Sequence, residues 1–508
     1  MGSFFRNEKN NERGAVQLIL VVAVLGGLLV AFILGKSIAE EDLFRLLLIG
    51  GTLGGLSILL IMGKKYWYLL ILAYPLGNTP LNIGAKEILL QELVTPLVFV
   101  WFLANIALRR QQFTVIRKES TFILLFCIWA GVVMYLNPVG ISLFGASTGG
   151  FRFYSHIGMA LCSYLVLSNQ KISNKDCFWI IFFVILASFI SLAQQILFFW
   201  MYGGVLGTDG EAYTWHQALA GPAMAITIYI VARYRWSQIL SIPKWYLSAI
   251  LLACVAISFF SGKRTGAASI LLIPLVSAFM RKEYAHAILM LAASLLVIAM
   301  LVLGQHTLFT LPYNVQRSLA NLPGDWDPEI TNLTTENTDT FRGRLWEFAY
   351  EKIRKDPFIG TGFRVSDAEL QTTAAMRMND DQKQIEELAI GSSWHSLWIG
   401  IAADFGIPAA IIFALFVIQS IILAGKLFNK KDLEQTQQIV VKMFFLYFIM
   451  FLITSYTGGH TARTPMGLWW MYGVLVGLKY TFPKLTSAKK DKIALDAESA
   501  FLPAASKA

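Results

Sequence analysis

Apolar segments of roughly 17–25 residues recur along most of the chain, and they constrain its fold more than any other feature. A helix of that length crosses about 30 Å of hydrocarbon. A soluble domain that is 56% hydrophobic and only 15% charged would expose large apolar patches to water. The segments also lack the strict alternation and ten-residue length of transmembrane barrel strands. The sequence therefore predicts an all-α, polytopic membrane protein.

We expect about fourteen transmembrane helices. Their predicted ranges are 15–35, 43–63, 66–81, 88–108, 121–137, 152–168, 178–202, 216–233, 246–261, 264–280, 284–303, 397–424, 439–457 and 466–483. The least regular are 66–81, which Pro75 interrupts, and 88–108, which carries Glu92. The first segment is longer than a signal-peptide core, so we expect it to be retained.

Basic residues fall in alternate loops between these segments. With the N-terminus in the cytoplasm, the basic clusters all land on the cytoplasmic side, as the positive-inside rule requires. They are Lys64-Lys65, Arg109-Arg110, Arg117-Lys118, Lys171 with Lys175, Arg233 with Arg235, Arg281-Lys282, Lys430-Lys431 and the tail from Lys479. The net charge of +10 is thus explained by topology, and we expect no nucleic-acid partner.

The same topology divides the chain into four regions. It predicts an N-terminal bundle of eleven spans in 1–303, an extracytoplasmic loop at 304–396, three spans in 397–483 and a cytoplasmic tail at 484–508. Within the loop, Asp339 or Thr340 can cap an amphipathic helix over 341–355 that stops at Asp356-Pro357. Such a helix either lies on the bilayer surface or roofs a cavity.

Five arginines are expected at the outer ends of the spans or in the loop. They are Arg152, Arg264, Arg342, Arg344 and Arg463. A charge near hydrocarbon is costly and indicates function, and arginine suits bidentate phosphate binding. The alternative is that these side chains only snorkel to lipid headgroups.

Three histidines also lie at outer ends of spans: His216, His395 and His460. His395 follows Trp394 where the long loop returns to the membrane, and a neutral imidazole there can accept a proton from a hydroxyl. The alternative is an interfacial histidine beside an aromatic belt. We predict no metal site, because no ligand spacing supports one, and the four cysteines indicate no disulfide framework. No nucleotide-binding or hydrolase motif is present.

Two stretches together resemble the O-antigen ligase and polymerase superfamily of membrane glycosyltransferases. One contains Arg344, Trp346 and Pro357-Phe358-Ile359-Gly360-Thr361-Gly362, and is similar to the family's Arg and Trp segment followed by Pro-x-x-Gly-x-Gly. The other is His395-Ser396, nine residues and Gly406, which is similar to the ligase signature. The turn at 261–266 resembles the family's Ser-Gly-x-Arg-x-Gly, and 215–221 is similar, less closely, to its Asn-x-Leu-Gly region. Ala410 and Lys263 depart from the family pattern.

The resemblance implies a GT-C-like, metal-independent glycosyltransferase that needs no cofactor. Its donor would be a glycan on undecaprenyl diphosphate. Arg264 and Arg344 would then be the first diphosphate ligands, with Arg152, Arg342 and Arg463 as further ones, and His395 would be the base for the acceptor hydroxyl or its positioner. The expected location is the bacterial inner membrane, with both termini cytoplasmic and the active site periplasmic.

The resemblance leaves several activities open. The extra spans favour a polymerase of a surface polysaccharide or exopolysaccharide, with a possible chain-length regulator as partner. The alternatives are a ligase that transfers glycan to lipid A core and a protein O-glycosylating transferase. A flippase for the same lipid-linked glycan is the alternative from another class, although repeat-like halves and charged, broken helices at the midplane are not evident.

Overall fold

The computed structural model describes residues 50, 54–55, 57–76, 80–83, 86–114, 117–139, 150–202, 205–206, 212–213, 215–332, 340–363, 394–430, 432–456, 464–465 and 467–481. The chain forms two compact units, one of Met1–Tyr66 with Asn82–Lys86 and one of Trp67–Leu81 with Glu87–Ala508. In the first unit the described part is mainly helical and includes η1 (Gly63–Lys65). All contacts discussed below lie within the second unit.

Helices make up most of the described residues. In chain order the remaining elements are α3 (Tyr68–Ala73), β1 (Pro80–Ile83), β2 (Lys86–Leu89), α4 (Leu90–Ala107), η2 (Lys118–Ser120), α5 (Thr121–Leu136), α6 (Phe151–Ser168), α7 (Asn174–Tyr202), β3 (Val205–Leu206), β4 (Ala212–Tyr213), η3 (Trp215–Leu219), α8 (Ala220–Arg233), α9 (Trp236–Ile239), η4 (Ile242–Lys244), α10 (Trp245–Phe260), α11 (Arg264–Met280), α12 (Tyr284–Gly304), α13 (Tyr313–Leu319), α14 (Pro328–Asn332), α15 (Thr340–Lys355), α18 (Leu397–Phe428) and α19 (Gln435–Thr454). Residues 467–481 form a last helix, here called the C-terminal helix.

Seven helical segments among the described residues are long and apolar enough to cross a membrane. They are Leu90–Ala107, Lys118–Leu136, Asn174–Leu197, Ile242–Phe260, Tyr284–Gly304, Leu397–Phe428 and Gln435–Thr454, with Arg264–Met280 as a shorter apolar helix. The all-α polytopic membrane fold is therefore confirmed, whereas fourteen spans remains a prediction. The span predicted at 15–35 and most of that at 43–63 lie outside the described residues. The span predicted at 66–81 contains only the short α3, which ends before Pro75.

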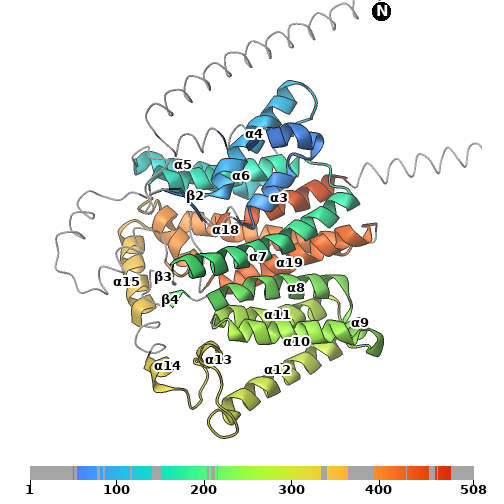
Figure 1. Ribbon diagram of the computed structural model, residues 1–508. Coiled ribbons are helices and arrows are strands. Elements are labelled where there is room, and N and C mark those ends of the chain that lie inside the picture. Colours follow the sequence, from blue (N-terminus) through green and yellow to red (C-terminus); the bar gives the residue numbers. More distant parts are fainter. Residues whose placement is uncertain are drawn as a thin grey trace, which may run out of the picture. The chain divides into compact units, whose positions relative to one another are not determined.

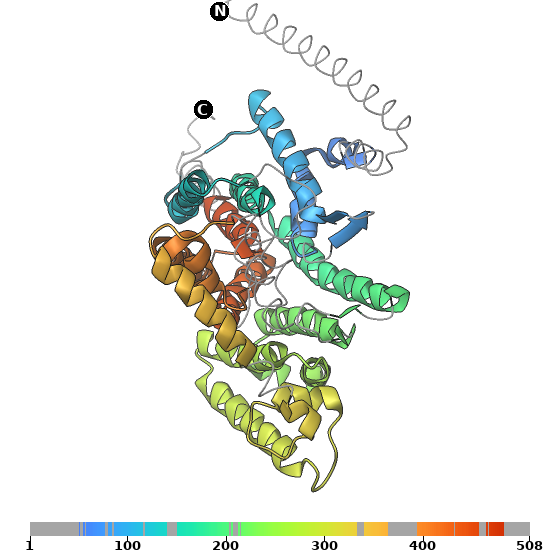
Figure 2. The same cartoon turned by 90° about the vertical axis from the view of Figure 1, so that its left-hand side faces the viewer.

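Helices packed side by side build the second unit, and α19 packs against α7, α8 and α11 as well as α18 (Figure 1). α18 packs against α5 and α19, and α8 packs against α7, α10 and α11. The interior around α18 is aromatic: Phe126 contacts Phe405, Phe413 and Trp469 through edge-on or tilted rings. Viewed from the end of the helices, α15 crosses in front of this bundle (Figure 2). The loop helix therefore covers one end of the membrane-spanning helices.

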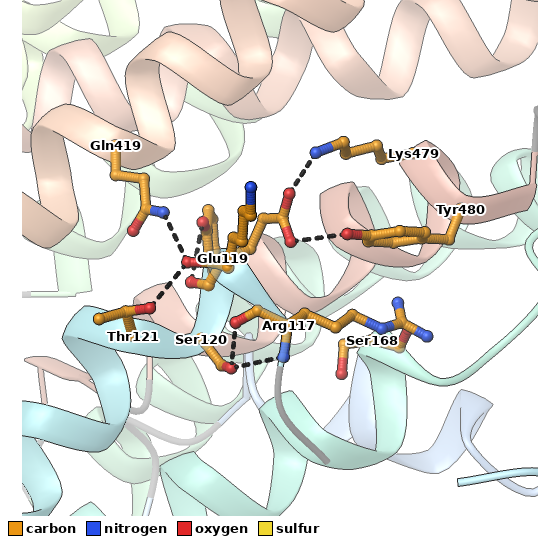
Figure 3. A network of polar contacts seen from close by, with 10 residues as sticks. Arg117, Glu119, Ser120, Thr121, Ser168, Gln419, Lys479 and Tyr480 are labelled. Carbon is orange, nitrogen blue, oxygen red and sulfur yellow. Dashed lines mark hydrogen bonds and ion pairs between the residues drawn. The ribbon is translucent and has the colours of Figure 1, made fainter. Parts of the chain in front are cut away.

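A polar network lies beside the C-terminal half of α18, where the Gln419 side chain donates to the Lys118 carbonyl (Figure 3). Glu119, in η2 just before α5, pairs with Lys479 and accepts a hydrogen bond of 2.9 Å from the Tyr480 hydroxyl. Arg117 donates to the Ser168 carbonyl at 2.6 Å and lies over the Tyr480 ring. These contacts join the start of α5 to the end of α6 and to the end of the C-terminal helix. All of these residues are on the side that the sequence predicts to be cytoplasmic.

Candidate functional site

The amphipathic helix predicted at 341–355 is confirmed as α15, and its apolar face packs on protein. Leu345 and Ala349 are fully buried against Trp394 and Ala403, the latter in α18. The indole Nε1 of Trp346 donates a hydrogen bond of 3.0 Å to the carbonyl of Trp394. Of the two placements that the sequence allowed, this packing favours a helix that covers the end of the bundle over one that rests on the bilayer surface.

The segment after α15 docks on a break in α18. Gly406 has φ 80° and ψ 166° inside α18, and Pro408 follows it. Across this break, the Gly362 N–H donates to the Asp404 carbonyl at 2.8 Å, and the Ile407 N–H donates to the Pro357 carbonyl at 2.8 Å. The Pro-x-x-Gly-x-Gly segment and the Gly406 end of the ligase-like signature therefore form one hydrogen-bonded unit.

Glycine is required at the centre of this contact for a steric reason. A Cβ on Gly406 would lie 2.0 Å from the carbonyl oxygen of Phe358, and a Cβ on Gly360 would lie 2.6 Å from the Gly406 nitrogen. Both glycines also have positive φ, 80° and 75°, which other residues rarely adopt. The two motifs thus carry glycine where their backbones touch.

Phe363 anchors the docked segment to α6 and α18. Its ring packs edge-on against Phe153, Tyr154 and Phe405, with centroid distances of 5.2, 4.9 and 5.1 Å. Its carbonyl accepts a hydrogen bond of 3.0 Å from Gly150. The segment that begins at Pro357 therefore contacts both α18 and α6, and these contacts fix the position of the C-terminal end of α15.

His395 lies between Trp394 and Leu397, and each of these two residues is held by a hydrogen bond to another part of the fold. Trp394 is fully buried and its Nε1 donates to Asp404 Oδ1 at 3.2 Å, while the Leu397 N–H donates to the Ser455 carbonyl at 3.0 Å. His395 itself has φ 52°, in the left-handed region that costs a residue with a Cβ of order 1 kcal/mol or more. Trp394 is in the protein interior and so is not part of an aromatic belt beside lipid. These contacts hold the backbone on both sides of His395 at the α15 end of α18.

Arg264 begins α11 and contacts the first part of the long loop. Its Nη1 donates to Asn321 Oδ1 at 2.7 Å, and its Nε donates to the Arg317 carbonyl at 3.4 Å. Nearby, the Ser318 hydroxyl donates to the Phe259 carbonyl at 2.8 Å. The turn between α10 and α11 and the loop beside α13 thus support one another, at the same end of the bundle as α15 (Figure 1).

Arg152 lies inside the protein, in a buried network with two residues that the sequence analysis did not select. Its Nε and Nη2 contact Glu92 Oε1 and Oε2 at 2.7 and 3.0 Å, and His156 Nε2 lies 2.6 Å from Glu92 Oε1. All three side chains are almost fully buried. A carboxylate in an apolar segment requires a partner, and Arg152 and His156 are four residues apart on one helix face, so the sequence did contain a signal for this network.

The remaining candidates are placed as follows. Arg344 is exposed on α15 and Arg342 is half-buried near its start. His216 packs edge-on against Phe260 at 5.3 Å. Arg463 and His460 lie outside the described residues. Among the residues that are described, no group of three or more His, Cys, Asp or Glu side chains could hold a metal ion.

The structure brings α15, His395 and the docked glycine segment into one assembly and places the Arg264 turn at the same end of the helices. The chain was also compared with protein families. Residues 247–414 match the family model described as O-antigen ligase. The match spans α10 to the break in α18 and includes Arg264, Arg344, His395 and Gly406, so the resemblance to the O-antigen ligase and polymerase superfamily is confirmed. A search of curated proteins found no match.

Proposed function

We propose that this chain, whose residues 247–414 match the O-antigen ligase family model, transfers glycan from undecaprenyl diphosphate to an acceptor hydroxyl outside the cytoplasm. The observation that carries the proposal is the docking of Pro357–Gly362 on the Gly406 break. This contact joins the two halves of the family signature and holds His395 at the end of α18 that α15 covers. A membrane-embedded donor can reach this end from the bilayer while its sugars remain outside it.

The reaction is a substitution at the anomeric carbon of the donor sugar. The acceptor oxygen forms a bond to that carbon, and the bond from the carbon to the phosphate oxygen breaks, so that undecaprenyl diphosphate leaves with the electron pair. In this proposal, Arg264 and Arg344 bind the diphosphate and stabilise the developing negative charge. His395 takes the proton of the acceptor hydroxyl, or it aligns that hydroxyl while the proton passes to the leaving diphosphate. Arg342 and Arg463 are additional diphosphate ligands.

Arg152 has a different role in this proposal. Its two hydrogen bonds to Glu92 keep its guanidinium in the interior, next to His156. We assign it to positioning the start of α6, which packs on Phe363 and thereby on the docked segment. In this assignment Arg152 mainly stabilises the packing of α6 against the docked segment. It is a diphosphate ligand of lower rank than Arg264 and Arg344.

The acceptor defines two candidate activities. Polymerisation of repeat units of a surface polysaccharide is our first candidate, because the predicted number of spans exceeds the dozen typical of ligases. Ligation to lipid A core is the second, and the description of the matching family as O-antigen ligase favours it. In both cases we propose an inner-membrane location with a periplasmic site, and for the polymerase a chain-length regulator as partner.

The test is glycan transfer by purified protein in detergent, with undecaprenyl-diphosphate oligosaccharide as donor. Lengthened or transferred glycan is expected from the wild type and should be abolished in Arg264→Ala and His395→Ala at unchanged expression. Arg354→Ala, which changes an exposed arginine on α15, and His286→Ala, in the first turn of α12, are the matched controls and should retain activity. Absence of product together with glycan translocation in liposomes would instead identify a flippase.

A further inference from the structure

A cavity of about 400 Å³ lies among α3, α4, α7, α8, α19 and the C-terminal helix. Its volume is in the range of small-molecule sites, about 300–1,000 Å³. The polar side chains that line it come from separate parts of the chain: Gln91, Ser188, Ser191, Gln195, Gln217 and Lys263. Tyr74, Tyr447 and Trp470 provide aromatic surface. Of the catalytic and diphosphate-binding candidates that the structure describes, none lines it.

The cavity lies toward the α15 end of the bundle. Lys263 precedes Arg264 at the start of α11, and Gln217 lies in η3, just before α8. Tyr447 is in the half of α19 nearer Thr454, and that end of α19 meets the start of α18 through Ser455 and Leu397. The cavity is therefore in the half of the helices nearest the candidate site, away from the Glu119 network.

Its lining contains several amide and hydroxyl side chains among apolar ones. Amide and hydroxyl side chains are costly in an apolar setting unless they bind a partner. Gln195 Oε1 is buried and has no hydrogen-bond partner within the part of the chain that the structure describes. A buried acceptor of this kind requires an explanation, and a ligand that donates hydrogen bonds supplies one.

The combination of groups fits a charged saccharide. Glutamine side chains can both donate to and accept from sugar hydroxyls, and aromatic rings offer apolar faces to pyranose rings. Lys263 contributes an ammonium group, a compact cation that attracts an anion. Its neighbour Arg264 binds Asn321 of the loop, so two consecutive basic residues contact different surroundings.

We propose that this cavity is a glycan-binding subsite in which Lys263 binds a negative charge and Gln195 a sugar hydroxyl. The inference rests on the proposed function, because it identifies the occupant as the saccharide head of the lipid-linked substrate. The negative charge can come from the lipid diphosphate or from an acidic sugar. In either case the subsite selects the saccharide that is presented to His395 and Arg264.

The test measures binding separately from transfer. Wild-type protein in nanodiscs is titrated with undecaprenyl diphosphate, with a galacturonic acid trisaccharide and with a neutral maltotriose. Lys263→Met should weaken binding of one of the two anionic probes by about tenfold, as expected for loss of a hydrogen bond to a charged group, and should leave maltotriose binding unchanged. The anionic probe that responds identifies the source of the charge.

Gln195→Leu supplies an independent variant, because it keeps a side chain of similar size inside an apolar helix. It should weaken binding of both trisaccharides several-fold without lowering thermal stability. Lys430→Met, at an exposed lysine beyond the opposite end of α18, is the control and should bind all three probes like the wild type. If neither Lys263→Met nor Gln195→Leu alters binding of any probe, the subsite assignment is wrong.

The two proposals fail in different ways. Lack of transfer by the wild type, with binding still sensitive to Lys263→Met, would overturn the proposed function and leave the subsite. Transfer that is lost in Arg264→Ala, with binding insensitive to both cavity variants, would overturn the subsite and leave the function.

Discussion

The backbone of Gly406 lies directly against the carbonyl of Phe358, so closely that a Cβ at position 406 would be 2.0 Å from that oxygen. This contact joins a loop residue to the break in α18, nearly fifty positions later in the chain. It fixes the end of α15 relative to His395, on which the proposed transfer depends.

Gly406→Ala should therefore abolish glycan transfer, because the docked segment must move away from α18 to admit the methyl group. Its positive φ adds strain that alanine tolerates poorly. The measurement is transfer activity with a thermal unfolding curve in the same detergent. Gly343→Ala is the matched control, since a Cβ there has no atom within 4 Å, and should retain full activity. Equal activities in the two variants would show that the docking is dispensable.

Glu92→Gln should destabilise the protein by about 3–5 kcal/mol, because it leaves Arg152 buried without its carboxylate partner. The readout is the free energy of unfolding or the melting temperature. Replacing the pair together, as Glu92→Gln with Arg152→Met, should recover part of the loss because no charge remains unpaired. A single variant as stable as the wild type would contradict the assignment of Arg152 to positioning.

Glu119→Ala should lower stability by about 1–3 kcal/mol without changing the KM for the lipid-linked donor. It removes the partner of Lys479 and Tyr480 at the end of α18 away from the candidate site. Thermal unfolding and steady-state kinetics together test this. Glu351→Ala, on the exposed face of α15, is the control and should change neither quantity appreciably. A raised KM in Glu119→Ala would indicate that this network takes part in substrate binding.

His395→Gly separates the imidazole from the backbone at that position. Glycine adopts φ near 52° without strain, so the variant should fold at least as stably as the wild type and yet lose transfer. His395→Ala should lose transfer as well, with lower stability than His395→Gly. The check is unfolding and activity of the two variants side by side. Retained activity in His395→Gly would mean that the conformation, and not the ring, is what matters.

Apolar length and periodicity predict the elements of this fold, because a helix in lipid must satisfy its own backbone. α15 and the long apolar helices from α4 onward follow from such patterns, whereas the short α9, α13 and α14 do not. The apolar face of α15 is the face that is buried. The failure at 66–81 has a local cause, since Pro75 ends the regular helix early.

Contacts between residues that are distant in the sequence do not follow from such patterns. The sequence indicates that Glu92 needs a partner, but which residues it meets depends on how α4 and α6 pack, and both Arg152 and His156 do so. Likewise, the residues around Gln195 and Lys263 are far apart in sequence and form a cavity only in three dimensions. Motif resemblance selected Arg264, Arg344 and His395, but the reason that glycine occupies positions 360 and 406 required the structure.

The most direct test of glycan transfer at this end of the bundle is a single-turnover experiment in nanodiscs with labelled undecaprenyl-diphosphate oligosaccharide and an acceptor. Released undecaprenyl diphosphate and newly formed glycosidic bonds are counted in the same sample. The account predicts one lipid diphosphate released for each bond formed by the wild type and Arg354→Ala, and neither product from Arg264→Ala or His395→Gly. Bond formation by both site variants at the wild-type rate would contradict it.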